Sequence, residues 1–228
     1  MIQSVIFDFD DTLITNVLLD YAGFDKPCKK LGINGLNFAN FLSLRKKGLL
    51  AKDIVKKIKL NSTMNFDVSK FISIRNEFLQ SEESISFLKL NVGALNVLSF
   101  LKSKKIKCFL CTIRNNKKII IEFLKRNNLL QYFSGIYLMD DIMADFDKSI
   151  PSNRVLIKNS LIHKVMKDHS LSNNVILLIG NSEDDYNSSN TMHIDFICYD
   201  NSHVSNTVKG IQKVKSMIDL KKKLISLV

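Results

Sequence analysis

The sequence predicts an α/β protein built on a doubly wound parallel sheet, with a helical segment inserted after the first strand. Short apolar runs at 5–7, 106–111 and 175–179 are typical of buried parallel strands. A polar cluster follows each run directly, and the stretch 14–90 shows helical rather than alternating spacing of apolar residues. Ligands bind at the carboxyl ends of strands in such sheets, so we expect the polar clusters to form the functional site.

The first strand ends in two aspartates on one side. Residues 2–13 read IQSVIFDFDDTL, and strand alternation places Asp8 and Asp10 on the same face. Two carboxylates held so close repel each other, which a divalent cation or a shared proton relieves. One carboxylate could then attack a substrate while the other moves a proton. The alternative is an Asp-rich turn that only caps a helix.

The full string at 6–13, IFDFDDTL, resembles the first motif of the haloacid dehalogenase superfamily. Phosphotransferases of that superfamily carry Asp-x-Asp-x-(Thr/Val) at the end of their first strand. The resemblance implies a Rossmann-like α/β core formed by residues 1–14 and 92–228. It also implies that residues 15–91 form a helical cap, which would exclude water and supply substrate contacts. The alternative is a helical bundle with no lid role.

Apolar spacing predicts the helices of the insertion and of the core. Ile54 and Ile58 recur at helical spacing between lysines, and Phe71 begins a second such series. In the core, Leu95 is expected on one face of a helix with Leu98 and Leu101. Further sequences predict a helix over 117–130, a strand over 135–138, a loop over 140–152, an edge strand over 194–199 and an amphipathic helix at the carboxyl end.

The second apolar strand ends in Thr112-Ile113-Arg114-Asn115, which resembles the second superfamily motif. That motif is an apolar strand ending in Thr or Ser. The resemblance implies that the Thr112 hydroxyl and nearby backbone N–H groups bind the phosphoryl oxygens of a substrate. Arg114 and Asn115 are further candidates for phosphate contact, with a surface role as the alternative.

The third superfamily motif is a lysine that offsets negative charge around nucleophile, phosphate and metal. Lys158 fits best, because it begins a predicted helix and precedes the next strand by about one helix and a turn. Lys148 is the competing candidate, and Lys164 fits less well.

The third strand, VILLI at 175–179, is followed by Gly-Asn-Ser-Glu-Asp-Asp, which resembles the fourth motif, GDxxxD. Asp185 matches the second acidic position, while Asn181 stands where the family has Asp. An amide oxygen is still an acceptable ligand for a hard cation, but one negative charge is lost. The resemblance implies a Mg²⁺ site formed by Asp8, Asp10 through its carbonyl, Asn181, and Asp185 directly or through water.

Composition narrows the class of protein. No apolar run approaches the ~18 residues of a membrane span, and the first strand leaves no room for a signal peptide, so we expect a soluble cytoplasmic protein. The four cysteines, which lack metal-site spacing, are expected to be reduced and mostly buried. The formal net charge is +11, but the lysines are spread over predicted helix faces, so a nucleic-acid partner is not expected.

The resemblance implies a Mg²⁺-dependent phosphatase of small phosphorylated metabolites, similar to the phosphoglycolate phosphatase-like branch. Asp8 would attack phosphorus, Asp10 would act as acid and then base, and Lys158 would offset charge. Asn181 leaves two alternatives open. One is a metal-independent haloacid dehalogenase, which the presence of Asp10 disfavours; the other is a weakly active or inactive member that binds a ligand or partner. The sequence indicates no oligomeric state.

Overall fold

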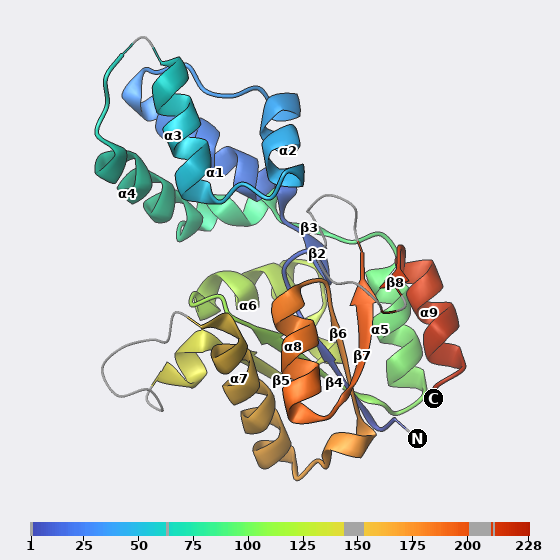
Figure 1. The fold of residues 1–228 in the computed structure, drawn as a ribbon. Coiled ribbons are helices and arrows are strands. Elements are labelled where there is room, and N and C mark those ends of the chain that lie inside the picture. Colours follow the sequence, from blue (N-terminus) through green and yellow to red (C-terminus); the bar gives the residue numbers. More distant parts are fainter. Residues whose placement is uncertain (1, 63, 144–152, 201–210, 212) are drawn as a thin grey trace. The chain divides into compact units, whose positions relative to one another are not determined.

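The computed structural model describes residues 2–62, 64–143, 153–200, 211 and 213–228 (Figure 1). The chain divides into two compact units. The smaller unit holds Asn16–Lys89, and the larger holds the residues up to Thr15 together with the described residues from Leu90 onward. No helix in the described ranges combines the length and apolarity needed to cross a membrane.

Within the described residues, the larger unit contains a six-stranded sheet in the order β5-β4-β1-β6-β7-β8. Its strands run parallel throughout. They are β1 (Ser4–Phe7), β4 (Lys107–Thr112), β5 (Gly135–Leu138), β6 (Ile176–Gly180), β7 (Asp195–Tyr199) and β8 (Lys213–Val214). From the central β1 the chain proceeds outward through β4 and β5, then returns to the other side of β1 for β6. This order confirms the predicted doubly wound fold.

Helices pack on both faces of the sheet. In the larger unit they are α5 (Ala94–Ser103), α6 (Lys117–Arg126), α7 (Arg154–His169), α8 (Glu183–Met192) and α9 (Met217–Ile225). Short 3₁₀ segments η2 (Leu130–Tyr132), η3 (Met139–Asp141) and η5 (Asn173–Val175) complete it. Helix α7 packs beside α8, and α5 beside α9 (Figure 1). Every residue of β6 is therefore buried, as expected for a strand covered on both faces.

The core holds α7 firmly against the sheet. Leu161 and Val165 of α7 pack in one apolar cluster with Ile6 of β1, Phe109 of β4 and Leu178 of β6. Because this face of α7 is fixed, its first turns are fixed as well, at the edge of the sheet where the strands end.

The face of α5 differs from the prediction. Leu95 is 42% exposed, whereas Ala94, Val97, Leu98 and Leu101 are buried. The helix begins at Ala94, directly after Gly93, whose positive φ of 88° ends the preceding turn. Successive helical residues turn by about 100°, so 94, 97, 98 and 101 share one side of the helix, while residue 95 lies about 120° from residue 101 and off that side.

The smaller unit is helical, as its apolar spacing predicts. It contains α1 (Val17–Leu31), α2 (Phe38–Lys46), α3 (Ala51–Asn61), α4 (Val68–Leu79) and the 3₁₀ segment η1 (Glu82–Phe87). Phe24, Phe41, Ile54 and Phe71 lie in its apolar core. Two short strands that the sequence did not predict, β2 (Ile14–Thr15) and β3 (Lys89–Leu90), pair where the chain passes between the units. The role of the smaller unit as a cap stays a prediction.

Candidate active site

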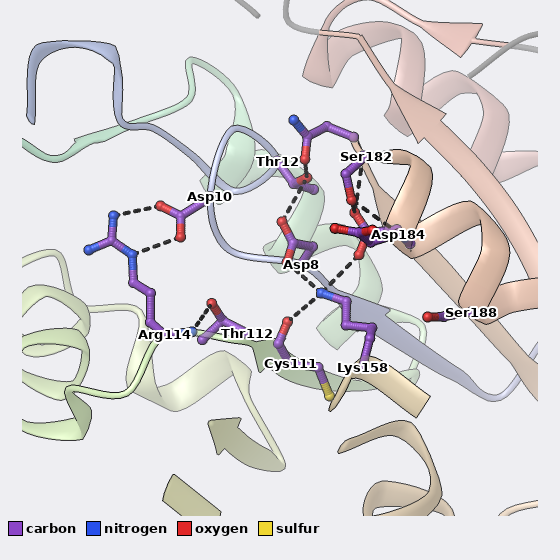
Figure 2. Close-up of polar contacts among 12 residues, drawn as sticks. Asp8, Asp10, Thr12, Cys111, Thr112, Arg114, Lys158, Ser182, Asp184 and Ser188 are labelled. Carbon is purple, nitrogen blue, oxygen red and sulfur yellow. Dashed lines mark hydrogen bonds and ion pairs between the residues drawn. The ribbon is translucent and has the colours of Figure 1, made fainter. Parts of the chain in front are cut away.

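Three neighbouring strands bring their polar ends together. Asp8 follows β1, Thr112 ends β4, and Asn181 follows β6. Since β4 and β6 flank β1 in parallel, these residues lie at one edge of the sheet. Figure 2 shows Asp8 and Thr112 there. The reversal of strand order occurs between β1 and β6, which is where doubly wound sheets bind ligands.

A tight turn fixes the first motif. The Asp8 N–H donates to the Ile179 carbonyl at 2.9 Å, which continues the pairing of β1 with β6. The N–H groups of Leu13 and Ile14 both donate to the Phe9 carbonyl at 3.1 Å and close the loop. Asp11 takes a left-handed backbone conformation with φ of 55°, which Asp tolerates better than most residues.

Lys158 reaches the site from the second turn of α7. Its Nζ donates to Asp8 Oδ1 at 2.5 Å and to the Cys111 carbonyl at 3.1 Å, and lies 2.8 Å from Asp185 Oδ1. All three ammonium protons therefore have acceptors, and the residue is only 2% exposed. Figure 2 shows the contacts of Lys158 with Asp8 and Cys111. Lys164 instead pairs with Asp168 on an exposed face, and Lys148 lies outside the described residues.

The electrostatics of this cluster follow from its burial. Burial raises the pKa of Asp8 to about 7; Asp185 and Asp10 add to the rise, and Lys158 opposes it. Burial alone would lower the pKa of Lys158, but Asp185 and Asp8 outweigh that effect and raise this pKa above its usual value. The proton of the Lys158–Asp8 pair therefore belongs to Lys158, and the ammonium is a fixed positive charge beside Asp8.

Both carboxylate oxygens of Asp185 have partners within the protein. Its Oδ1 faces Lys158, and its Oδ2 accepts from the Ser182 backbone N–H at 3.1 Å and the Ser182 hydroxyl at 2.7 Å. Gly180 makes room for it, since a Cβ at residue 180 would lie 2.4 Å from Asp185 Cγ. Asp185 thus orients Lys158, and a direct bond to a metal would require it to give up one of these contacts.

The sequence did not lead us to expect that Gly180 and Ser182 position Asp185. The signal for Ser182 was present as a capping box, Ser-x-x-Asp, at the start of α8. The need for glycine at 180 depends on where the Asp185 side chain turns, and no sequence pattern states that.

Two oxygen atoms of the kind that hard cations bind lie beside the Thr12 hydroxyl. The Thr12 hydroxyl lies 3.4 Å from Asp8 Oδ2 and 3.4 Å from Asn181 Oδ1. One hydroxyl has one hydrogen, so it can donate to only one of these oxygens. Asp8 Oδ2 and Asn181 Oδ1 are two hard oxygen donors, and Mg²⁺ binds few protein oxygens and keeps several waters, so the pair fits this ion. In the described ranges no three His, Cys, Asp or Glu side chains converge on a metal position, so Asn181 would have to contribute.

Arg114 pairs with Asp10, and its contact with a phosphate stays a prediction. Its Nε and Nη2 each donate to one oxygen of Asp10, both at 2.7 Å, and its side chain is 21% exposed. Thr112 is buried, and its Oγ1 accepts from the Arg114 backbone N–H at 3.3 Å. Asn115 is exposed. No sequence pattern paired Arg114 with Asp10, which lies 104 residues earlier.

The profile of the haloacid dehalogenase-like hydrolases matches residues 5–199 of the chain. The chain belongs to this family. The match runs from β1 to β7 and includes the inserted helices, and it confirms the family that the four sequence motifs indicated. A search of curated proteins finds no match.

Solved structures of haloacid dehalogenase-like hydrolases share the fold over nearly the whole chain. A HAD-superfamily hydrolase of subfamily IA from Geobacter sulfurreducens is 16% identical, with a TM-score of 0.73, covering 99% of this chain and 96% of that one. A predicted phosphoglycolate phosphatase from Haemophilus somnus is 13% identical, with a TM-score of 0.73 and 98% of each chain covered. A HAD-superfamily hydrolase from Ehrlichia chaffeensis is 19% identical, with a TM-score of 0.62 and coverage of 100% and 98%.

Proposed function

We propose that this haloacid dehalogenase-like hydrolase is a phosphatase that hydrolyses a small phosphorylated metabolite through an aspartyl-phosphate on Asp8. The observation that carries the proposal is the division of charge among the three carboxylates. Lys158 forms ion pairs with Asp8 and Asp185, while Arg114 forms a separate ion pair with Asp10. One carboxylate is thereby set beside a buried cation for attack, and a second is held apart for proton transfer.

In the first step, an oxygen of Asp8 forms a bond to phosphorus and the bond to the ester oxygen breaks. Asp10 gives a proton to the leaving oxygen. In the second step, water attacks phosphorus, Asp10 takes its proton, and the bond between phosphorus and Asp8 breaks to release phosphate. Thr112 and Lys158 would lie beside the phosphoryl oxygens, where fixed positive charge and donors lower the barrier most.

Mg²⁺ is the cofactor that this proposal requires. Asp8 Oδ2, Asn181 Oδ1 and the Asp10 carbonyl would hold it, with water completing its coordination. When bound, it would offset negative charge on the phosphoryl group. The two cationic side chains leave one of the three carboxylates uncompensated, which supports a site for additional positive charge.

The test is phosphate release from a panel of small phosphomonoesters, with Mg²⁺ and with a chelator. We expect release that requires Mg²⁺. Chloride release from haloacids in the presence of chelator would instead favour a dehalogenase. Thermal stabilisation by phosphate esters without any turnover would favour an inactive, ligand-binding protein.

A further inference from the structure

The carboxylate of Asp10 is held differently from that of Asp8. Asp8 has one oxygen on Lys158, whereas both Asp10 oxygens accept from the guanidinium of Arg114 at 2.7 Å (Figure 2). In this arrangement the Asp10 carboxylate turns toward Arg114 and away from Asp8 (Figure 2). Such a two-point contact between planar groups fixes direction as well as distance.

Arg114 is itself rigidly mounted. Its backbone N–H donates to Thr112 Oγ1 at 3.3 Å, and its carbonyl accepts from the Met139 N–H at 3.2 Å. Its guanidinium carbon lies 5.9 Å from the centre of the Phe9 ring, in the turn that carries Asp10. The backbone on both sides of the ion pair is therefore fixed, and the pair sets where Asp10 points.

The two-point contact is that of an ionised Asp10 carboxylate. With an N–H aimed at each oxygen, a proton on either oxygen would face a donor. A protonated oxygen loses its contact to Arg114, whether Asp10 has just accepted that proton or is about to give it. The geometry with both contacts intact therefore positions the ionised carboxylate, which is the form that meets water. Accepting a proton from water belongs to the second step of the reaction.

We propose that Arg114 is a positioning residue that holds Asp10 for the hydrolysis of the aspartyl-phosphate on Asp8. The inference rests on the proposed phosphatase function. It predicts that loss of Arg114 slows the second step selectively, so that the phosphorylated enzyme accumulates. A residue that only bound substrate would raise KM instead, and a residue that only stabilised the fold would lower both steps together.

The experiment mixes enzyme with excess p-nitrophenyl phosphate and Mg²⁺, follows nitrophenolate release from the first turnover, and measures intact mass after an acid quench. This ester has a good leaving group, so its first step depends little on proton donation. For Arg114→Ala we expect a burst of about one nitrophenolate per active site, then a steady rate lower by about 10²-fold, the smaller end of what a positioned base contributes. The quenched protein should carry one phosphoryl group, and KM should fall with kcat.

Two variants keep the result interpretable. Arg114→Lys retains the charge but cannot engage both Asp10 oxygens, so it should accumulate less phosphorylated enzyme than Arg114→Ala. Arg126→Ala removes an exposed arginine paired with Glu122 on α6 and should behave as wild type. Thermal unfolding of each variant checks the fold, and Arg114→Lys carries the test if Arg114→Ala does not fold.

The outcomes separate the two proposals. Turnover by the wild type with no phosphorylated enzyme in either Arg114 variant overturns the role of Arg114 and leaves the phosphatase proposal intact. Absence of turnover by the wild type on the whole panel overturns both. A burst and a trapped phosphoryl group in Arg114→Ala support both.

Discussion

Lys158 Nζ lies 2.5 Å from Asp8 Oδ1, although the two residues are 150 positions apart in the sequence. The contact joins the first turns of α7 to the end of β1, and both partners are buried. A buried cation placed there both supports the candidate nucleophile and ties the helix to the sheet. Loss of this lysine should therefore affect stability as well as activity.

Lys158→Met should lower the free energy of unfolding by about 3–5 kcal/mol, because Asp8 and Asp185 would lose their shared buried partner. Urea denaturation at neutral pH measures this. Lys164→Met is the matched control: its pair with Asp168 is 3.4 Å long and more than a third exposed, and should be worth at most about 1 kcal/mol. Equal effects of the two substitutions would contradict the account.

Gly180→Ala should displace Asp185 and, through it, Lys158. The added Cβ would lie within 2.6 Å of three Asp185 atoms, and overpacking of this kind costs about 1–3 kcal/mol. The midpoint temperature of thermal unfolding and the rate of phosphate release should both fall. Gly23→Ala in α1 is the control, since its Cβ would meet nothing closer than 3.4 Å and alanine favours helix. A Gly180→Ala protein that matched wild type in both assays would show that Asp185 can move freely.

Asn181→Asp should tighten Mg²⁺ binding. The substitution restores the carboxylate of the family motif next to Asp8 Oδ2, and ligand charge is a main determinant of affinity for hard cations. We expect the Mg²⁺ concentration for half-maximal thermal stabilisation to fall on the order of tenfold. If Mg²⁺ stabilises both proteins at the same concentrations, residue 181 is not a ligand.

The cysteines should be inert in the folded protein. All four are free and buried. Burial raises the pKa of Cys108 and of Cys111 to about 12 and, together with Asp25, that of Cys28 to about 11, so almost no thiolate is present at pH 8. A disulfide reagent should label none of them rapidly in native protein and all of them after unfolding. Fast labelling of native protein would mean that these sites open readily.

The sequence indicated the main elements of the site because strand ends can be read along a chain. Asp8, Thr112 and Asn181 each follow an apolar run, and parallel strands bring such ends to one edge. Lys158 was inferred as the motif lysine from its position in the order of motifs along the chain, and in the structure it contacts Asp8. These relationships need only topology.

What the sequence left open depends on where side chains turn. A surface role for Arg114 was left open, because no sequence pattern near this residue indicates that it pairs with Asp10. Gly180 is explained only by the direction of the Asp185 side chain. Leu95 was placed on the wrong face because steps of three residues drift around a helix, and the buried face centres on Ala94, Val97, Leu98 and Leu101 instead.

The most direct test of the central claim compares wild type with Asp8→Asn on the best phosphomonoester of the panel, with Mg²⁺ present. The substitution keeps the size of the side chain and removes the attacking oxygen. We predict phosphate release by the wild type and none by Asp8→Asn above the uncatalysed rate, with both proteins folded. Undiminished release by Asp8→Asn would show that Asp8 is not the nucleophile.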